Sequence, residues 1–327
     1  METVRQLAEE VAGKIKGYLP DGYGDMEYEI VEMPKNNGVY WTGVRFRRAG
    51  ETDSAIIYME PYLNGYKRGM SFDKVMEDIA EKITECAEVG FMDLVLAAGK
   101  FENIKGSLEL ALVNTRANRK QLTDIPHFPM EDLSVACRIA VPMKEGQGSI
   151  QVTESHLKSW GIGKEQLFQQ ALVNMQRPGM CTLQGMDDVM LGLTGELPPG
   201  NLLEAAGDAA GGAVSHPELN DGMMFVLTTK SKNYGASAMA CPDVMGKVDR
   251  LFPEGFYLLP SSVHECLVIR KDGGVSVKDL EQMVFEVNRT AVEEHERLSD
   301  HVYEYDRERQ SIRLASKGLE KERGMER

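Results

Sequence analysis

The chain has 327 residues, of which 42% are hydrophobic and 27% are charged, a mixture typical of folded globular proteins and unlike that of disordered chains. Its formal net charge of -14 repels phosphate backbones and anionic lipids, which argues against binding to nucleic acids or to membrane surfaces. The five cysteines include no C-x-x-C pair, and no apolar stretch reaches about 18 residues. We therefore expect no disulfide framework, no zinc ribbon and no transmembrane helix, and a reducing cytoplasm as the location.

The first hundred residues predict a helix, an antiparallel meander of three strands and a second helix. Apolar residues recur every three or four positions through residues 4–18, which is typical of an amphipathic helix. Alternating runs at 26–33, 38–47 and 54–60 then predict strands, because successive side chains of a strand point to opposite faces. Ser71 is placed to cap the next helix, whose apolar residues form a single stripe.

From residue 101 onward, strands and helices alternate, and the same order is then followed a second time. The first passage predicts a strand at 107–113, a short polar helix at 116–123, strands at 133–142 and 149–153, and helices at 154–160 and 163–175. The second predicts a strand at 223–228, a helix at 235–251, strands at 256–259 and 265–270, a helix at 276–295, and a terminal hairpin at 302–305 and 312–314.

Short landmarks recur in both passages and suggest a divergent duplication. In each passage a proline and a histidine stand before a hydrophobic strand, and the helix that later follows carries a Val-Asn pair. These residues are Pro126, His127 and Val173-Asn174 in the first passage, and Pro260, His264 and Val287-Asn288 in the second.

The fold class that we expect is α+β (mixed α/β), in which an N-terminal helix and meander precede two strand-and-helix units that share or abut a sheet. Glycine's flexibility and proline's missing N–H argue against a regular element in the connection between the two units. The expected segments are an N-terminal unit at 1–100, a first α/β unit at 101–192, a connection rich in Gly, Pro and Ala at 193–221, a second α/β unit at 222–315 and a frayed tail at 316–327.

Several motifs spread along the chain carry a resemblance to a known family. They are Ile57-Tyr58-Met59-Glu60-Pro61-Tyr62, Leu112-Val113-Asn114, Ile125-Pro126-His127, Leu259-Pro260-Ser261-Ser262-Val263-His264-Glu265, Glu286-Val287-Asn288 and Leu298-Ser299-Asp300. Together they resemble a bacterial family known only as domain of unknown function 5688, over nearly the whole chain. Members of that family are met in anaerobic gut Firmicutes, often near mobile elements, so the resemblance implies a cytoplasmic bacterial protein. It implies no reaction, ligand or catalytic residue.

The segment 258–269 places two serines, a histidine and a glutamate between two apolar runs, and it is the candidate for an active site. Ser262, His264 and Glu265 have the residue types of a hydrolytic triad. On an extended segment Ser262 and His264 share a face while Glu265 points to the other, and the G-x-S-x-G elbow is missing from this segment. The favoured interpretation is a structural corner, in which Pro260 sets a turn and the serine hydroxyls cap backbone groups.

Outside that segment, His127, Asp132 and Lys230 are the candidates for ligand binding. The histidines of the chain lack the i, i+4 spacing of a zincin helix, so we expect no resident metal. Lys230 opens a loop that follows a strand and presents backbone amides to an anion. The turn 161–164 before a helix has the same potential but lacks the rest of a P-loop motif.

Two classes of function follow. The lack of a complete catalytic signature in the sequence favours a non-enzymatic binding or regulatory module, linked to a mobile element and without a cofactor, whose two α/β units form a groove for a protein or small molecule. The alternative is a hydrolase or metal-dependent enzyme centred on His264 and Glu265. Burial of His264 with saturated hydrogen bonds would support the first class, and an open pocket around it the second.

Overall fold

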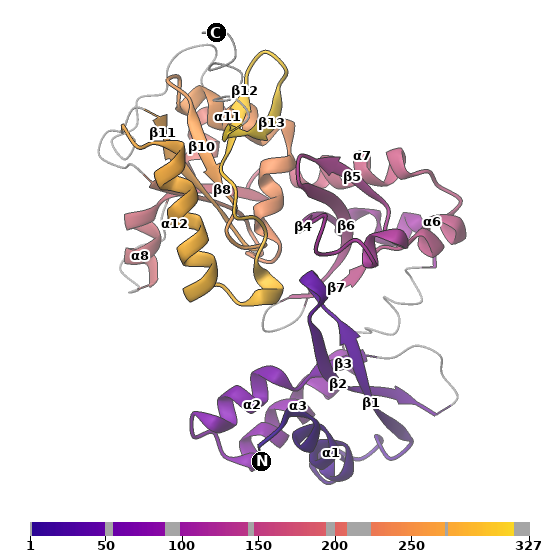
Figure 1. The fold of residues 1–327 in the computed structure, drawn as a ribbon. Helices are drawn as coiled ribbons and strands as arrows, with labels where there is room; N and C mark the ends of the chain where they lie inside the picture. The colour runs from indigo at the N-terminus through magenta and orange to yellow at the C-terminus, as the bar shows by residue number, and fades with distance from the viewer. Residues whose placement is uncertain are drawn as a thin grey trace. The chain divides into compact units, whose positions relative to one another are not determined.

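A computed structural model shows the chain as two compact units built from helices and antiparallel sheets (Figure 1). The structure describes residues 2–49, 55–88, 99–142, 147–193, 200–207, 224–271 and 274–316. The first unit comprises Met1–Ile104 with Val141–Gly148, and the second comprises Lys105–Ala140 with Ser149–Arg327. The α+β class that the sequence predicts is confirmed. Within the described ranges, none of the helices combines the length and the apolar character that crossing a membrane requires.

The first unit is a three-stranded antiparallel sheet whose helices pack against one face. Strand β1 pairs with β2 and β2 pairs with β3, so the predicted meander is confirmed. The elements are α1 (Val4–Lys14), β1 (Met26–Pro34), β2 (Tyr40–Arg48), β3 (Ala55–Tyr58), α2 (Glu60–Lys67), α3 (Phe72–Glu88) and α5 (Phe101–Ile104).

Alternation along the strands decides which face of this sheet is buried. Met26, Phe46 and Ile57 point toward the helices and join the apolar stripes of α1 and α3 in one hydrophobic core. The Ser71 hydroxyl accepts a hydrogen bond from the backbone N–H of Lys74 at 3.2 Å, as the predicted cap of α3 requires. The N-terminal unit therefore follows directly from the period of its apolar residues.

The second unit begins with a sheet of order β4-β6-β5, in which β7 lies beside β6. Helix α7 packs on β4, and the ring of Phe168 meets that of Phe128 edge-on with centroids 4.7 Å apart. The elements are β4 (Leu108–Asn114), β5 (His127–Met130), β6 (Leu133–Pro142), β7 (Gln147–Gln151), α6 (Glu154–Trp160) and α7 (Lys164–Met175).

The rest of the second unit forms a six-stranded antiparallel sheet of order β13-β12-β10-β11-β9-β8. Its elements are β8 (Cys181–Gly185), α8 (Met186–Leu193), α9 (Leu202–Gly207), β9 (Met224–Thr229), α11 (Pro242–Leu251), β10 (Phe256–Leu259), β11 (Cys266–Arg270), α12 (Val277–Thr290), β12 (Tyr303–Asp306) and β13 (Ser311–Leu314).

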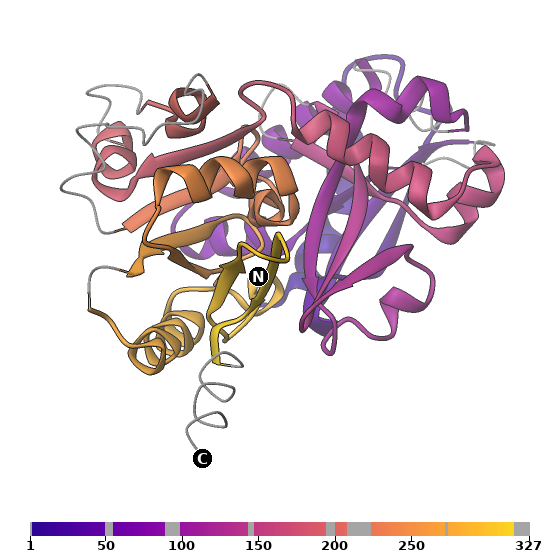
Figure 2. The same ribbon diagram turned by 90° about the horizontal axis from the view of Figure 1, so that it is seen from above.

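Both faces of this sheet are covered, which explains why its central strands are almost wholly apolar. Leu259 and Ile269 pack with Leu280 and Val284 of α12 on one face. On the other face the ring of Phe225 lies 4.9 Å from that of Phe252, which follows α11 directly. Figure 2 shows α11 in orange and α12 in gold on opposite sides of these strands.

The two sheets of the second unit repeat one arrangement. In the first, β4 and β5 flank β6, and in the second, β9 and β10 flank β11, with every neighbouring pair antiparallel. A helix with a Val-Asn pair near its end follows each trio, α7 in one case and α12 in the other. The shared order supports the predicted duplication, which stays a prediction.

The two Val-Asn pairs have the same structural role. Each valine is exposed, whereas each asparagine is buried and donates from Nδ2 to backbone carbonyls beyond its helix. Asn174 bonds the carbonyl oxygens of Lys105 and Leu108, at 2.6 and 2.9 Å. Asn288 bonds the carbonyl oxygen of Ser299 at 2.9 Å and Oδ1 of Asp300 at 2.7 Å. The pair therefore marks the point where each helix is fastened to a neighbouring segment.

The helix predicted at 116–123 is wrong, and the side chains of Asn114 and Asn118 bond the backbone of this segment. The backbone N–H of Ala117 donates to Oδ1 of Asn114, and Nδ2 of Asn118 donates to the carbonyl oxygen of Asn114. The segment forms turns and one 3-10 turn at Gln121–Thr123 instead.

Two further helices are shorter than predicted. The segment 235–251 divides into a 3-10 turn at Gly235–Ala240 and α11, which begins at Pro242, since proline is accepted at the first helical position but not in a helix interior. The helix predicted at 276–295 ends at Thr290.

The connection predicted at 193–221 contains a helix that composition did not indicate. Leu202 and Leu203 of α9 are buried, at 1% and 4% exposure, and this burial explains why the short helix forms beside glycine-rich sequence. Most other residues of the connection, and those of the tail after Ser316, lie outside the described residues. The sequence also missed the short elements α2, β5, β8 and α8.

Replacing Asn288 with Ala should lower the free energy of unfolding by about 2 kcal/mol, because it leaves the Ser299 carbonyl oxygen without its buried donor. Urea denaturation measures this loss. The control is Val287→Ala on the neighbouring exposed residue, which should change the value by less than about 0.5 kcal/mol. Equal losses from the two variants would contradict the fastening role of the asparagine.

Candidate functional site

The predicted site, residues 260–265, is the loop that joins β10 to β11. Backbone hydrogen bonds attach it to residues 296–299: Val263 N–H donates to the Glu296 carbonyl oxygen at 2.8 Å, and Leu298 N–H donates to the Ser261 carbonyl oxygen at 3.1 Å. The loop is thus held as if it were a short strand.

The other side of the loop lies against the segment after β9. The hydroxyl of Thr228 donates to the carbonyl oxygen of His264 at 2.7 Å, and the backbone N–H of Ala236 donates to the carbonyl oxygen of Val263 at 3.2 Å. Gly235 passes so close that a Cβ there would collide with Thr228 Oγ1 and the His264 carbonyl oxygen. Glycine is therefore required by the close approach of two backbones.

The side chain of His264 pairs with Glu296, whose Oε1 lies 3.3 Å from Nε2 of the imidazole. The hydrogen bond between them raises the pKa of His264 and lowers the pKa of Glu296, while burial opposes both shifts. A hydrogen bond to the backbone of Lys232 raises the pKa of His264 further. The two side chains are 37% and 33% exposed, so solvent screens the pair.

The structure does not bring Ser262, His264 and Glu265 together as a triad. The Ser262 hydroxyl oxygen accepts a hydrogen bond from the backbone N–H of His264 at 2.9 Å, which is the capping role of the structural interpretation. Glu265 is exposed, and the carboxylate at the imidazole is that of Glu296. Neighbouring residues of an extended segment point apart, whereas a residue 32 positions away approaches through the fold.

Glu296 is the residue of this candidate site that the sequence did not indicate. In the sequence, the run Glu293–Glu296 indicates only a hydrated helix end. In the structure, Nε2 of His295 in this run lies 3.7 Å from Oε1 of Glu296. The only sequence signal for Glu296 is its place in this charged run, shortly before the family motif 298–300.

Asp132, a predicted ligand-binding residue, belongs to a buried polar cluster between the two sheets of the second unit. The hydroxyls of Tyr303 and Ser299 both donate to its carboxylate, the latter at 3.0 Å, and they lie 2.8 Å from one another. Burial and the neighbouring carboxylate raise the pKa of Tyr303 above its ordinary range. The carboxylate is thus engaged by the protein's own hydroxyls.

The remaining ligand-binding candidates lie apart in the second unit. The imidazole Nδ1 of His127 is 2.7 Å from the Ile125 carbonyl oxygen, and the His127 carbonyl oxygen accepts a hydrogen bond from Nζ of Lys164 at 2.6 Å. Lys230 is exposed at the end of β9. In the part of the chain that the structure describes, no three or more His, Cys, Asp or Glu side chains form a group suited to a metal ion.

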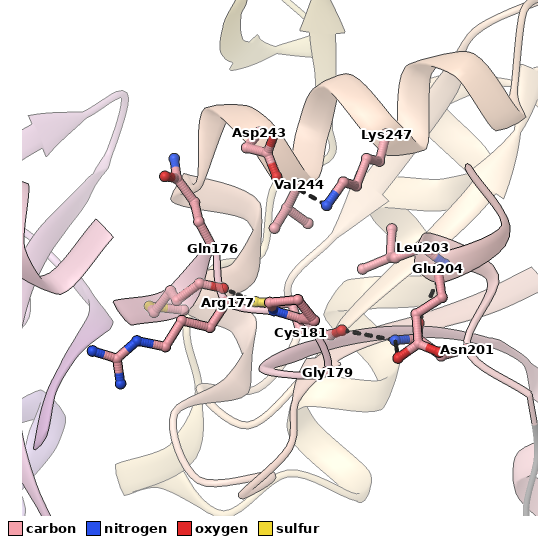
Figure 3. Close-up of a pocket in the computed structure, with 12 residues that line it drawn as sticks. Gln176, Arg177, Gly179, Cys181, Asn201, Leu203, Glu204, Asp243, Val244 and Lys247 are labelled. Atoms are coloured by element: carbon pink, nitrogen blue, oxygen red, sulfur yellow. Dashed lines mark hydrogen bonds and ion pairs between the residues drawn. The ribbon is translucent and has the colours of Figure 1, made fainter. Parts of the chain in front are cut away.

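A pocket of about 290 Å³ opens elsewhere in the second unit, between the end of α7, the start of β8, and helices α9 and α11 (Figure 3). Lys247 and Asp243 of α11 form an ion pair at 3.0 Å on one wall, and Glu204 belongs to the opposite wall. Arg177 adds a second cation. The walls therefore carry both signs of charge.

Asn201 shapes this pocket from within the predicted connection. Its Oδ1 accepts hydrogen bonds from the backbone N–H groups of Leu183 and Leu203, at 3.1 and 3.2 Å, and its Nδ2 donates to the Cys181 carbonyl oxygen at 3.1 Å. One side chain thereby fixes α9 to β8. The pocket has no signal in the sequence, because its residues come from three separate segments, 175–181, 201–204 and 243–247.

Substituting Gly235 with Ala should destabilise the protein by about 3 kcal/mol, because the added Cβ would overlap two backbone segments, including the Thr229 nitrogen at 2.8 Å. Gly246→Ala in α11 is the matched control, since the nearest atom to its new Cβ lies 4.0 Å away and alanine favours a helix by up to about 1 kcal/mol. Thermal and urea denaturation compare the two. A tolerated Gly235→Ala would refute the close approach.

The His264–Glu296 pair should stabilise the protein most between about pH 4.5 and 6.5. The raised pKa of His264 adds stability below its ordinary value of 6.5, which is lost as the pH rises through the folded-state pKa. The lowered pKa of Glu296 adds stability above 4.5, which is lost as the pH falls.

The stability difference between wild type and His264→Gln, measured by urea denaturation across pH, should peak in that window and fall above it. Its size should stay below about 1 kcal/mol, because both side chains are about a third exposed. His301→Gln is the control, since that histidine is 50% exposed and its nearest carboxylate is 3.9 Å away. A flat difference would show that the pair contributes nothing.

Comparison with known proteins agrees with the resemblance that the motifs carry. A family model described as a family of unknown function, DUF5688, matches residues 4–307. No curated protein and no solved structure matches the chain. The match spans both compact units, so the chain belongs to the family of unknown function DUF5688.

Proposed function

We propose that the protein is a non-enzymatic binding module, which takes up a small ligand in the pocket between α7, β8, α9 and α11. The observation that carries this proposal is the cavity itself, about 290 Å³ in volume and lined by polar and charged side chains. That volume lies at the lower end of the range for small-molecule sites. The pocket is lined by α7 and β8 from the first predicted α/β unit, by α9 from the connection and by α11 from the second unit. This lining is what a ligand groove between the two predicted units would need.

The charges on the walls point to a zwitterion. Lys247 offers a donor to a carboxylate, and Asp243 and Glu204 offer acceptors to an ammonium group, while Arg177, which donates to Oδ1 of Asn174 at 2.8 Å, adds positive charge nearby. A ligand with a single charge would face two groups of its own sign, whereas a small zwitterion such as an amino acid satisfies both. We propose that class of ligand, in a bacterial protein of the reducing cytoplasm with a regulatory role linked to mobile elements.

A hydrolase or metal-dependent enzyme centred on His264 and Glu265 has less support. The Ser262 hydroxyl is committed to a backbone N–H, and Glu265 is not the carboxylate at the imidazole. The loop that carries His264 is hydrogen-bonded on both sides, as a structural corner requires. The imidazole of His264, which is 37% exposed, is the one feature of this loop that supports a catalytic role.

Thermal denaturation of the full chain with a panel of amino acids and other small zwitterions tests the proposal. A ligand at ten times its dissociation constant should raise the free energy of unfolding by about 1.4 kcal/mol and the melting temperature by about 2–4 °C. Lys247→Met should abolish the shift, because it removes a cation from the wall.

Lys158→Met provides the matched control, since Lys158 is an exposed residue of α6 that does not line the pocket. It should leave the ligand-induced shift unchanged. A shift that survives in Lys247→Met, or a panel in which only anions stabilise the protein, would contradict a zwitterion site in this pocket.

A further inference from the structure

Three sulfur atoms meet beneath the floor of the pocket. Met175 ends α7, Cys181 begins β8, and Cys241 immediately precedes α11, so three separate elements deliver them. Sγ of Cys241 lies 4.0 Å from Sδ of Met175, and the neighbouring thiol of Cys181 together with burial raises the pKa of the Cys241 thiol. All three residues are at least 95% buried, with exposures of 1%, 5% and 0%.

The protein fixes these sulfurs from several sides. The backbone N–H of Leu110 donates to Sδ of Met175 at 3.2 Å. Sγ of Cys181 lies 3.5 Å from the Met175 carbonyl oxygen, and Sγ of Cys241 lies 3.9 Å from that of Ser237. The thioether sulfur has two lone pairs, and the Cys241 thiol approaches it in addition to the Leu110 N–H. The cluster is therefore assembled without any ligand.

The pocket gives access to the cluster. Met175 and Cys181 both line the cavity, and Figure 3 shows Cys181 between its two walls. Asp243 and Glu204 lie on those walls together with Lys247 and Arg177, so the entrance carries both signs of charge and does not repel a single cation strongly. Cys241 is fully buried and does not line the cavity, but its Sγ lies 4.0 Å from Sδ of Met175, which does, so an ion would approach it from the side of Met175 and Cys181.

The donor set selects a soft ion. Thiolate and thioether ligands prefer Cu(I), whereas a structural zinc site closes a tetrahedron of four nitrogen, sulfur or oxygen ligands. With metal–sulfur bonds of about 2.3 Å, two sulfurs of a trigonal site lie about 4 Å apart. The separation of Cys241 Sγ from Met175 Sδ is 4.0 Å, which fits this geometry without movement.

We propose that Met175, Cys181 and Cys241 form a binding site for one Cu(I) ion. Two S–H bonds break and two Cu–S bonds form, the two protons pass to water, and the Met175 thioether donates a lone pair as the third ligand. The copper stays Cu(I) throughout, and no electron is transferred. The site uses the pocket as its entrance and does not depend on the zwitterion proposed above.

The competing explanation is that the two cysteines only fill the core, as free cysteines commonly do. Burial does not separate the two explanations, because all five cysteines are buried. Cys137, at 0% exposure in the same unit, therefore supplies a control of equal burial.

Titration of the reduced full chain with Cu(I), under anaerobic conditions and against a chromogenic Cu(I) chelator, tests the site. Wild type should hold one Cu(I) per chain. Cys181→Ala and Cys241→Ala should each weaken binding by roughly 100-fold, and Met175→Leu by roughly 10-fold. Cys137→Ala should bind as wild type does. Unchanged affinity in Cys181→Ala and Cys241→Ala, or an equal loss in Cys137→Ala, would overturn the proposal.

X-ray absorption of copper-loaded wild type provides a measurement that needs no variant and so does not depend on the variants folding. A first shell of three sulfurs supports the site, and a shell of nitrogen or oxygen refutes it. The zwitterion assay is run with a metal chelator present. Protein that binds Cu(I) without binding any zwitterion would contradict the proposed function alone, and the reverse result would contradict only the copper site.

Discussion

Buried polar groups must find partners, and in the second unit this constraint joins the two sheets through Asp132, Ser299 and Tyr303. The carboxylate comes from the turn between β5 and β6, while the two hydroxyls come from the segment around β12. Ser299 also donates its backbone N–H to Pro260, so the cluster holds the segment that supports the loop 260–265. The position of the predicted site thus depends on a cluster that lies outside it.

The family motif around His264 is best explained by a structural role, and its one partly exposed ion pair is that of His264 with Glu296. Its backbone is bonded to residues on both sides, its serine hydroxyl caps a backbone N–H, and Gly235 is required beneath it. A concave surface with polar walls lies elsewhere in the unit, where α9 and α11 approach β8. The segments that line the pocket, which we propose as the binding site, are therefore different from the segment that carries the densest motif.

Periodicity predicted the elements that bury one face or both. The meander, the stripe of α3, the pair α6 and α7, and the strands β10 and β11 all follow from it. It failed at 116–123, where asparagine side chains bond the backbone, and at 202–207, where burial rather than composition makes a helix. Local rules do not include partners that only the folded chain supplies.

The sequence by itself determined the fold class, the family motifs and the recurrence of a Val-Asn pair, because these depend on local period and identity. Only the tertiary structure decided that His264 meets Glu296 rather than Glu265, and that Cys241 lies against Met175, which lines the pocket with Cys181. Residues 32 and 66 positions apart are brought together by sheet register and helix packing. Such contacts have no local signal, since loop closure lets any two distant segments meet at nearly the same entropic cost.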